Sequence, residues 1–535
     1  MCAALLRIAN LNIPLSYTDD TLREAVLRKL RIPAARLKAV TLVKRSVDAR
    51  DKGDVHFVMT LDALVDREED LLRQLKPGIA VRAEKKKPLP LPKSCFTKRP
   101  VVVGAGPAGL FAALMLAKAG ANPMLIERGK PVDRRTQDVD AMRRDGTLDP
   151  DSNVQFGEGG AGAFSDGKLT TGIKSPWQQT VLETFVRHGA PEEILYEQKP
   201  HIGTDRLKGV VASIRNEIIA LGGEVRFETK LTGLIIRGEH VEGITVRCGE
   251  VSEEILTDTV LLAIGHSARD TIQTLFNQGV IMVQKPFAMG VRIEHPQEMI
   301  SRSQYGRAAS HPALGAAPYK LAVRTPDGRG AYTFCMCPGG EVIPAASQPG
   351  GVVVNGMSYH ARDGRNANAA LLVGVQPGDF GDDHPLAGFV WQRSIEQAAF
   401  RTGGGDFRAP VQRVEDLLSG RATTRLCDVQ PTYLPGVTPA DLRACLPEFI
   451  IEDLKHGIRQ MDKQLRGFAM PDAVLTGVET RSSSPVRLPR NERMMASITG
   501  LFPVGEGAGY AGGIVSAAVD GINAAVAALE RSDAL

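Results

Sequence analysis

The stretch from Pro100 to Gly129, PVVVGAGPAGLFAALMLAKAGANPMLIERG, places the strongest constraint on how this chain folds. A β-branched run at Val101–Val103 predicts a buried strand, and Gly104, Gly106 and Gly109 follow it with the spacing G-x-G-x-x-G. In a dinucleotide-binding unit these glycines provide a tight turn, close backbone approach to a pyrophosphate, and close packing of helix on strand. The sequence therefore predicts a strand–turn–helix unit that binds a dinucleotide. The residues between the glycines that we expect at the same site are Ala105, Pro107 and Ala108.

The next predicted strand supports this interpretation. Pro123 to Ile126 is apolar and leads into Glu127, about 20 residues after Gly104, where such folds place the carboxylate that accepts hydrogen bonds from the adenosine ribose hydroxyls. A carboxylate at this point also repels a 2′-phosphate, so FAD or NAD fits better than NADP. The expected fold class is α/β, with a Rossmann-like domain.

Length and composition set wider limits. At 535 residues the chain is too long for one small core, and we expect two or three domains. Its net charge of +4 is small for this size, so we expect neither a nucleic-acid nor a membrane partner. The seven scattered cysteines show no disulfide framework and no paired C-x-x-C spacing, and no apolar run is long enough to span a membrane. We therefore expect a cytoplasmic protein without a metal site.

Residues 1–84 precede the dinucleotide unit and are predicted to form a separate domain. Their pattern reads β-α-β-β-α-β, beginning with an alternating strand at Leu5 to Ile13, which predicts a ferredoxin-like α+β fold. Apart from Tyr17 and Phe57 the segment lacks aromatic side chains, so the base-stacking platform of an RNA-recognition motif is missing. A docking domain is the favoured interpretation.

A Pro- and Lys-rich segment, 85–99, follows this domain. Its alternating prolines favour an extended, semi-rigid linker with solvated lysines. Together with the domain before it, the linker makes residues 1–99 the part of the chain that could bind a partner protein.

Residues 100–284 are expected to form the first part of the dinucleotide-binding domain. After a helix and an inserted β-meander, an apolar strand at Val260 to Ile264 ends at Gly265, where the backbone must pass close to the adenosine end of the cofactor. His266 follows and is interpreted as a loop residue rather than as an acid or base.

The same part of the chain contains a second glycine-rich segment. Residues 154–173 read VQFGEGGAGAFSDGKLTTGI, which is too rich in glycine for a helix or an ordinary strand. Successive backbone N–H groups in such a loop can bind an anion, so we expect the loop to wrap the pyrophosphate. A glycine-rich hairpin without a ligand is the alternative. Candidate contacts in this loop are Gly160, Ala161, Gly162, Ser165 and Lys168.

Residues 285–465 alternate irregularly between strand-like pieces and turns, which predicts a β-rich substrate domain inserted into the dinucleotide-binding domain. Cys335 and Cys337 are two residues apart, so on a strand both would face the same side. They could be a redox or nucleophilic pair, or simply small core residues.

The dinucleotide-binding domain is expected to resume at 466–535. A strand at Leu501 to Val504 leads into a glycine-rich turn, and a helix of small residues is predicted to begin at Ile514. The N-terminus of that helix carries partial positive charge and unpaired N–H groups, which would stabilise negative charge on a reduced flavin. The residues expected at the cofactor here are Gly505, Glu506, Gly507, Gly512, Gly513 and Ile514.

Four further segments make a family resemblance specific: GEGGAGAFSDGKL, YTFCMCPGG, ETRSSSPVRLPR and GEGAGYAGGIVSAAVDGI. With the first fingerprint they resemble the glutathione-reductase-type superfamily of FAD proteins. More narrowly, they are similar to a family described as FAD-dependent dehydrogenases or NAD(P)/FAD-dependent oxidoreductases, over about residues 1 to 530. The resemblance implies FAD bound by the glycine-rich turns, by Glu127 and Arg128, by the Gly160 to Gly162 loop and by Gly265. It implies no particular substrate.

Two absences narrow the class. The chain has no second strand–G-x-G-x-x-G–helix unit, so NADH or NADPH would act only as a transient electron donor. It also lacks the C-x-x-x-x-C motif expected after the first flavoprotein domain of a disulfide reductase. Both absences argue against a pyridine-nucleotide–disulfide reductase and favour a flavoprotein with a single dinucleotide domain, in which substrate and reductant reach the flavin through one shared cavity.

The sequence thus predicts a flavoenzyme that moves a hydride or an electron pair between a small organic substrate and non-covalently bound FAD. Two alternatives stay open: a flavin-dependent RNA-modifying enzyme, and an FAD-stabilised protein that binds a partner without catalysis. Candidate acid, base or substrate-binding residues are Tyr332, Cys337, His295, Tyr359 and Arg481.

Overall fold

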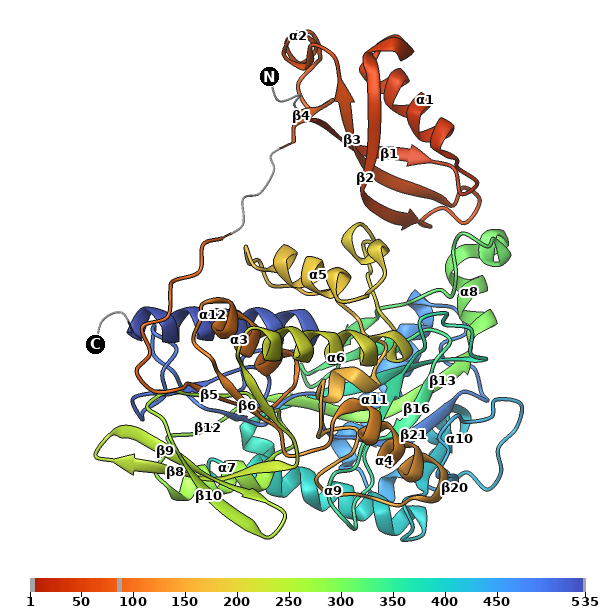
Figure 1. Ribbon diagram of the computed structural model, residues 1–535. Coiled ribbons are helices and arrows are strands. Elements are labelled where there is room, and N and C mark those ends of the chain that lie inside the picture. The colour runs from red at the N-terminus through yellow and green to blue at the C-terminus, as the bar shows by residue number, and fades with distance from the viewer. Residues whose placement is uncertain (1–4, 84–88, 533–535) are drawn as a thin grey trace.

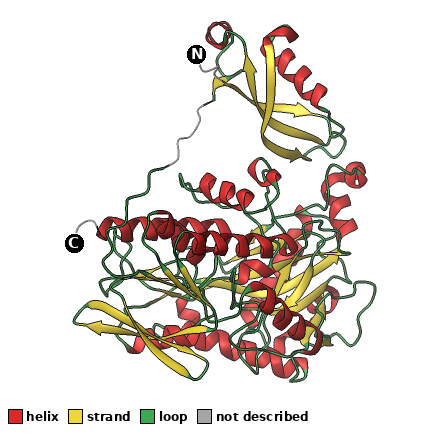
Figure 2. Ribbon diagram, viewed as in Figure 1, coloured by secondary structure: helices red, strands yellow, loops and turns green. Residues whose placement is uncertain are grey.

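The structure is a computed structural model that describes residues 5–83 and 89–532 (Figure 1). Cys2 and residues 85–88 of the predicted linker lie outside the described residues. Figure 1 shows a small N-terminal domain above a larger body, and Figure 2 shows helices on opposite sides of the body with strands between them. Within the described ranges, no helix is long and apolar enough to cross a membrane.

The N-terminal domain has the element order β-α-β-β-α-β that the sequence pattern predicts. Its sheet has the strand order β2-β3-β1-β4, and every neighbouring pair is antiparallel. Thr18 caps the first helix through a reciprocal bond pair with Thr21, which satisfies amide groups at the helix start. The elements are β1 (Leu5–Ile13), α1 (Asp19–Leu30), β2 (Leu37–Asp48), β3 (His56–Val65), α2 (Glu68–Gln74) and β4 (Val81–Arg82).

Arg45 makes several of the contacts between this domain and the body. Arg45 Nε on β2 donates a hydrogen bond of 2.7 Å to Glu197, and the Arg45 amide donates one of 2.7 Å to the Tyr196 carbonyl. The Arg45 guanidinium also lies over the Tyr196 ring, 5.5 Å from its centroid. The N-terminal domain therefore has a specific contact on the body, in addition to the connecting chain.

A five-stranded parallel sheet forms the centre of the dinucleotide-binding domain, in the order β23-β11-β5-β6-β7. Side chains alternate between its faces. Val102 faces the helices α3 and α12, whereas Val101 and Val103 face a three-stranded meander and α7. Because both faces are covered, these strands consist almost entirely of apolar residues. The strands are β5 (Val101–Val103), β6 (Met124–Ile126), β7 (Glu224–Arg226), β11 (Val260–Leu262) and β23 (Leu501–Pro503).

The other elements of this domain cover the two faces of the sheet. On one side lie α3 (Pro107–Lys118), α5 (Gln178–Arg187), α6 (Thr204–Ala220) and α12 (Ile514–Ser532), and on the other lie β8 (Thr229–Arg237), β9 (His240–Cys248), β10 (Val251–Leu256) and α7 (Arg269–Asn277). Helix α4 (Val132–Asp145) extends away from this layer, where Val139 packs against residues of the inserted domain. The small glycines of α3 and α12 allow the two helices to pack closely: a Cβ on Gly521 would lie 2.0 Å from the Ala108 carbonyl oxygen.

The inserted domain is built on a seven-stranded sheet, in the order β14-β15-β18-β13-β21-β19-β20. Its central strand β13 (Phe287–Pro296) is buried along almost its whole length. Met289 and Val291 point into the apolar core beneath α9 and α11, whereas Arg292 and Glu294 point to the opposite face. That opposite face thus carries buried charge toward the dinucleotide-binding domain.

The elements of the insertion are β14 (Ala322–Arg324), β15 (Gly330–Cys337), β18 (Asn366–Val375), β19 (Ala409–Arg413), β20 (Val437–Pro439), β21 (Val474–Glu479), α8 (Gln297–Tyr305), α9 (Ala387–Gly403), α10 (Val414–Ser419) and α11 (Glu448–Gln464). Two short antiparallel pairs complete the fold: β16 (Glu341–Pro344) with β17 (Val354–Met357), and β12 (Val283–Gln284) with β22 (Val486–Arg487). Strand β21 pairs with β13, so the sheet of the insertion continues to Glu479. The boundary that the sequence places at residue 465 therefore lies too early in the chain.

The glycine-rich segment also differs in one detail from the sequence prediction, which excluded a helix there. Ala161–Phe164 forms a short 3-10 turn. Gly160, with φ at 57°, reverses the chain, and its carbonyl accepts a bond of 3.3 Å from the Ala163 amide. Short 3-10 turns also occur at Ala34–Arg36, Glu192–Leu195, Gly306–Ser310, Pro377–Phe380 and Leu442–Ala444.

Candidate functional site

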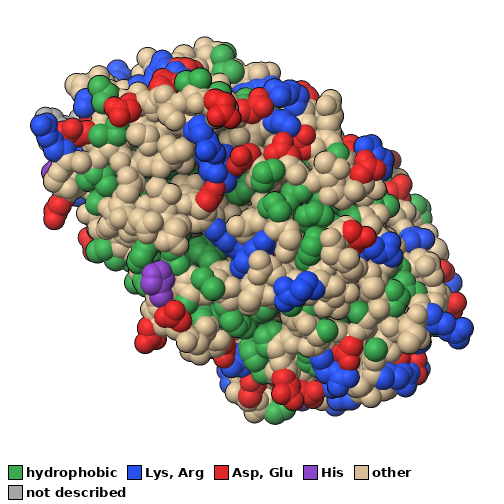
Figure 3. Space-filling model, turned by 90° about the horizontal axis from the view of Figure 1, so that it is seen from below, with side chains coloured by type: hydrophobic (Ala, Val, Ile, Leu, Met, Phe, Trp, Pro, Cys, Tyr) green, Lys and Arg blue, Asp and Glu red, His purple; other side chains and the backbone are tan. Residues whose placement is uncertain are grey.

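A cavity of about 310 Å³ connects the turn after β5 with the charged face of the inserted sheet. Both glycine-rich segments, the start of α12 and residues of three inserted strands line it. Seen from below the body, a few Lys and Arg side chains gather near the middle of the face among apolar side chains (Figure 3). The cavity thus brings together segments that are widely separated in the sequence.

The three glycines of the first turn differ in what surrounds them. A Cβ on Gly104 would lie 2.4 Å from the Ala263 carbonyl oxygen, and one on Gly109 would lie 1.7 Å from the Gly104 carbonyl oxygen. A Cβ on Gly106 would meet nothing closer than the Gly160 Cα, at 3.8 Å, and Gly106 lines the cavity. The first and third glycines are therefore required by packing, whereas the second keeps space open for a ligand.

Glu127 connects three loops around the cavity. Its carboxylate accepts hydrogen bonds from the amides of Ala105 at 2.8 Å, Gly129 at 2.9 Å and Gly157 at 2.9 Å. A carboxylate offers about four acceptor positions, so one position on Oε2 is left for a ligand hydroxyl. Glu127 therefore shapes the site and still has the capacity to accept a hydrogen bond from a ribose.

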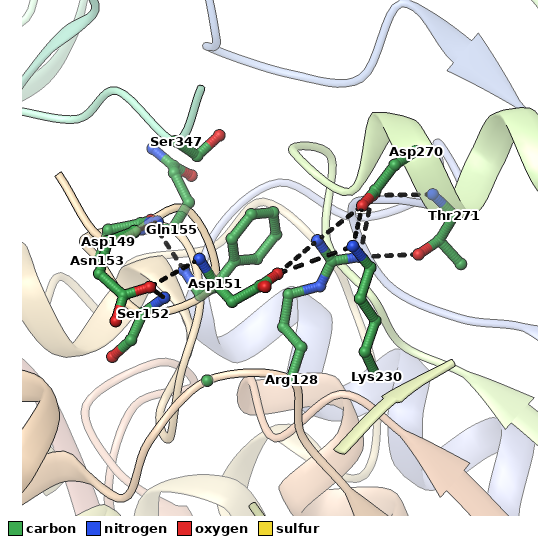
Figure 4. A network of polar contacts seen from close by, with 12 residues as sticks. Arg128, Asp149, Asp151, Ser152, Asn153, Gln155, Lys230, Asp270, Thr271 and Ser347 are labelled. Carbon is green, nitrogen blue, oxygen red and sulfur yellow. Dashed lines mark hydrogen bonds and ion pairs between the residues drawn. The ribbon is translucent and has the colours of Figure 1, made fainter. Parts of the chain in front are cut away.

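Arg128 is held in a charged network at the same end of the cavity (Figure 4). Its guanidinium donates bonds to Asp270 at 2.9 Å and to Thr271 at 2.7 Å, and stacks over the Phe156 ring at 4.2 Å. Lys230 lies 2.5 Å from the same Asp270 carboxylate. Burial alone would raise the pKa of Asp270, but Arg128 and Lys230 outweigh it and hold this pKa well below its usual range, so the carboxyl stays ionised.

The glycine-rich loop is fixed by its own polar residues. Ser165 Oγ donates to the Gly162 carbonyl at 2.7 Å and accepts from the Gly167 amide at 3.0 Å. Asp166 is buried and accepts a bond of 2.9 Å from Arg362 Nε. Lys168 Nζ lies 3.5 Å from the Asp166 carboxylate, is buried and has no hydrogen-bond acceptor. The loop therefore presents an ammonium group with unused hydrogen-bonding capacity beside the cavity.

The turn before α12 is fixed by a carboxylate on the helix itself. Asp520 accepts bonds from the Gly505 amide at 2.7 Å and from Arg490 Nη2 at 2.6 Å. Glu506 lies on the cavity side of this turn, with Oε1 3.7 Å from His266 Nδ1. His266 Nε2 is buried without a hydrogen-bond partner, and His266 also lines the cavity.

The inserted domain contributes the polar end of the cavity. Glu479 lines it and forms a buried ion pair with Arg292, whose Nε lies 2.5 Å from Glu479 Oε2. Arg481 also lines it, but its guanidinium is engaged by Glu396, at 3.0 Å from both Nε and Nη2, and by Ser267 and Ser347 at 3.1 and 2.6 Å.

Comparison with known proteins decides the family. A family model described as "FAD-dependent protein, C-terminal domain-like" matches residues 286–482, an FAD binding domain model matches residues 99–140, and a domain of unknown function matches residues 6–64. An uncharacterized protein of Clostridium beijerinckii (strain ATCC 51743 / NCIMB 8052) is 47% identical over 533 residues, which is 99% of each chain. The chain belongs to this FAD-dependent protein family. It is a flavoprotein, with FAD as its cofactor.

Several solved flavoprotein structures are similar to it at low identity. A geranylgeranyl bacteriochlorophyll reductase-like protein of Thermoplasma acidophilum is 12% identical, with 82% of this chain and 79% of that chain covered and a TM-score of 0.36. The quinol fumarate reductase of E. coli is 13% identical over 82% and 71% of the two chains, with a TM-score of 0.37. The glycerol-3-phosphate dehydrogenase of Bacillus halodurans, complexed with FAD, is 11% identical over 82% and 64%, with a TM-score of 0.34.

The residues of the flavoprotein's cavity fit a dinucleotide. Gly106 leaves space where a Cβ would project, and α3 has no side-chain cap, so amide groups of its first turn are free to bind a phosphate. Lys168 Nζ and His266 Nε2 are buried without hydrogen bonds, so they add polar groups that a ligand could satisfy.

Most of the residues proposed from sequence for the cofactor come together in this cavity. Three do not line it: Ala105, Gly109 and Gly507. Those that line it are Gly104, Gly106, Pro107, Ala108, Glu127, Arg128, Gly160, Ala161, Gly162, Ser165, Lys168, Gly265, Glu506, Gly505, Gly512, Gly513 and Ile514.

The five candidates for chemistry are spread more widely. Arg481 lines the cavity, and the other four do not. His295 is fully buried, with Nε2 2.8 Å from the Phe468 carbonyl oxygen, and burial lowers its pKa to about 4. Tyr332 packs on an apolar cluster where burial raises its pKa, Tyr359 is 44% exposed, and Cys337 is fully buried.

Sequence reasoning missed several cavity residues because no motif marks them. Asp166, Asn355 and Glu479 contribute polar groups, and Phe334 and Phe156 contribute rings. Asp166 lies within the glycine-rich loop, so its place in that motif could have indicated it. Asn355 and Glu479 come to the cavity only through the pairing of distant strands.

Proposed function

We propose that this flavoprotein transfers a hydride or an electron pair between a small organic substrate and non-covalently bound FAD. The observation that carries the proposal is the single cavity that joins the dinucleotide-binding turns to polar residues of the inserted sheet. A substrate held by the insertion would lie in the same space as the cofactor. NADH or NADPH would be a transient donor in that space.

The domain assignments are part of this proposal. Residues 1–84 form a ferredoxin-like docking domain, which the strand order and antiparallel pairing of its sheet support. The two dinucleotide-binding segments form a glutathione-reductase-type FAD domain, and the insertion, extended to about residue 482, holds the substrate.

FAD supplies two-electron redox chemistry when bound. The chain's own residues would bind and orient the cofactor and the substrate. The α3 amide groups and Lys168 bind negatively charged groups, and Glu127 accepts a ribose hydroxyl through its remaining acceptor position. Arg481 is already held by Glu396 and two serines, so we assign it a positioning role rather than a direct bond to a substrate carboxylate.

Gly106→Ala tests the FAD site directly. Gly106 has φ at −74°, which alanine adopts without strain, and its Cβ would meet no protein atom closer than 3.8 Å. The substitution should leave the FAD-free protein as stable as wild type but fill space reserved for the ligand. Loss of one charge-assisted amide bond, worth about 2 kcal/mol, should weaken FAD binding by roughly 10- to 100-fold.

The matched control is Gly172→Ala, at an exposed glycine whose Cβ would meet nothing within 4 Å. FAD affinity is measured by fluorescence titration of the FAD-free proteins, and their stability by thermal unfolding. Equal FAD affinity of Gly106→Ala and Gly172→Ala would refute this placement of the cofactor. Anaerobic titration of the FAD-loaded wild type with NADH and then NADPH tests the reaction: flavin that neither donor reduces would exclude pyridine nucleotides as donors.

A further inference from the structure

Strand β15 carries an extra residue beside the cavity. Phe334 pairs with Ala370 and Cys337 pairs with Asn368, so β15 advances by three residues while β18 advances by two. Cys335 lies within this bulge with φ at 39°, in the left-handed region that a residue with a side chain seldom adopts. Bulges next to active sites redirect side chains. Here the bulge separates the environments of two cysteines that a regular strand would place alike.

The two cysteines differ in access and are connected through the Cys335 backbone. Cys335 lines the cavity, whereas Cys337 is fully buried. Both are free cysteines. Cys337 Sγ donates to the Cys335 carbonyl oxygen at 3.3 Å. A cysteine that lines the cavity is thus in contact with a buried one.

Two cations act on this pair. Arg292 Nη1 donates to the Cys335 carbonyl oxygen at 2.8 Å and lies 4.0 Å from Cys337 Sγ. Although burial lowers the pKa of Arg292, Glu479 and the two thiols raise it above its ordinary value, so it is a permanent cation. Lys168, the second cation, lines the same cavity and its ammonium has no hydrogen-bond acceptor.

The surroundings of the two sulfurs make Cys335 lose its proton at lower pH than Cys337. The neighbouring Cys337 side chain, with Lys168 and Arg292, holds the pKa of Cys335 well below its usual range, despite burial. The Cys335 side chain and burial raise the pKa of Cys337. Because the thiolate is the nucleophile, the accessible sulfur is the reactive one and the buried sulfur keeps its proton.

We propose that Cys335 and Cys337 form a dithiol–disulfide couple that exchanges with a small disulfide bound in the FAD cavity. The Cys335 thiolate attacks one sulfur of the disulfide RSSR, forms a mixed disulfide and releases RS⁻. Cys337 then loses its proton to this RS⁻ and attacks Cys335 Sγ, which forms the Cys335–Cys337 disulfide and releases a second RS⁻. The dithiol is oxidised by two electrons and RSSR is reduced by two.

The inference deepens the proposed function by naming a small disulfide as the substrate class. It rests on that function, because repeated turnover needs the FAD that the proposal places in the same cavity. The C-x-C pair on a strand also differs from the C-x-x-x-x-C motif whose absence the sequence shows.

The test uses dithiobis(nitrobenzoate) as the small disulfide, on FAD-free and FAD-loaded full-length protein, with peptide mapping by mass spectrometry. In the wild type we expect a Cys335–Cys337 disulfide. Cys337→Ser should stop at a mixed disulfide on Cys335, and Cys335→Ser should leave Cys337 unmodified. Cys248→Ser, at an exposed cysteine that does not line the cavity, is the control and should give the wild-type result at the pair. Circular dichroism verifies that each variant is folded.

Alkylation gives a second measurement on the wild type alone. With iodoacetamide at mildly acidic pH, Cys335 should be labelled at least about tenfold faster than the exposed Cys248, because only a thiolate reacts. Wild-type protein in which Cys335 and Cys337 both stay reduced while Cys248 is modified would overturn the proposal. So would Cys337 that reacts equally fast in Cys335→Ser. FAD affinity measured on the same samples separates the two proposals: a disulfide that forms without FAD binding leaves the couple standing and refutes the flavoenzyme.

Discussion

Glu396→Gln should destabilise the body of the protein severely, because Glu396 is a buried carboxylate shared by two buried arginines. Its side chain is fully buried, and Arg269 and Arg481 are only 9% and 7% exposed. Arg269 donates to it at 2.9 and 2.7 Å, Arg481 donates twice at 3.0 Å, and Thr480 Oγ1 donates at 2.9 Å. Glutamine keeps the shape but replaces one acceptor oxygen with an amide that faces donors.

The expected loss of stability follows from the two arginines that keep their charge after the substitution. Two guanidinium groups stay buried without their counter-charge, and removing one partner of a buried ion pair costs about 3–5 kcal/mol. Burial alone would raise the pKa of Glu396, but Arg269 and Arg481 hold it well below its usual range. The carboxylate is therefore ionised at neutral pH, and its charge is what the substitution removes.

The assay is urea-induced unfolding of the FAD-free protein, followed by tryptophan fluorescence. The chain has two tryptophans, Trp177 in the dinucleotide-binding domain and Trp391 on α9, so the signal reports on the body. The control is Glu415→Gln, at a 44% exposed carboxylate paired with Arg413 and Arg421, which should cost at most about 1 kcal/mol. If Glu396→Gln loses no more stability than Glu415→Gln, the reasoning about this network is wrong.

Three other changes should act through single contacts. Burial alone would raise the pKa of Asp166, but Lys168 and Arg362 lower it from an ordinary 3.8 to about 2. The ionised carboxylate should therefore contribute about 2 kcal/mol of stability above pH 3.8, and this contribution should be lost as the pH falls toward 2. Asp166→Asn should be less stable than wild type at neutral pH, and acid-unfolding curves should show that difference shrinking over this window; a constant difference would contradict the prediction. Gly521→Ala should force α12 away from α3 at a cost of about 3 kcal/mol or more, visible as reduced thermal stability, and an unchanged midpoint would exclude the close contact. Arg45→Ala should free the N-terminal domain from Glu197, which should speed limited proteolysis of the connecting segment; unaltered cleavage would show that the contact does not hold the domain.

Local patterns account for the parts that the sequence predicted well. The strands Leu5–Ile13 and Val101–Val103 and the start of the helix at Ile514 lie where their hydrophobic periodicity and glycines place them. Most of the residues predicted for the cofactor line one cavity for the same reason, because the glycine spacing and the carboxylate after β6 depend on local backbone geometry.

Non-local pairing explains what sequence reasoning could not reach. The end of the inserted domain expected at residue 465 is too early in the chain, because β21 pairs with β13, nearly 200 residues before it. No sequence feature of either strand predicts that pairing. The difference between Cys335 and Cys337 depends on a bulge in the register with β18. Glu396 lies on a helix with an ordinary amphipathic pattern, so its buried pairing with two arginines is visible only in three dimensions.

The central claim is that the cavity binds FAD, and the most direct test is the absorption spectrum of the purified protein with quantification of the flavin released on denaturation. The account predicts the bands of oxidised flavin and, after saturation with added FAD, about one FAD per chain that denaturation releases without proteolysis. A colourless protein that takes up no added FAD would contradict it.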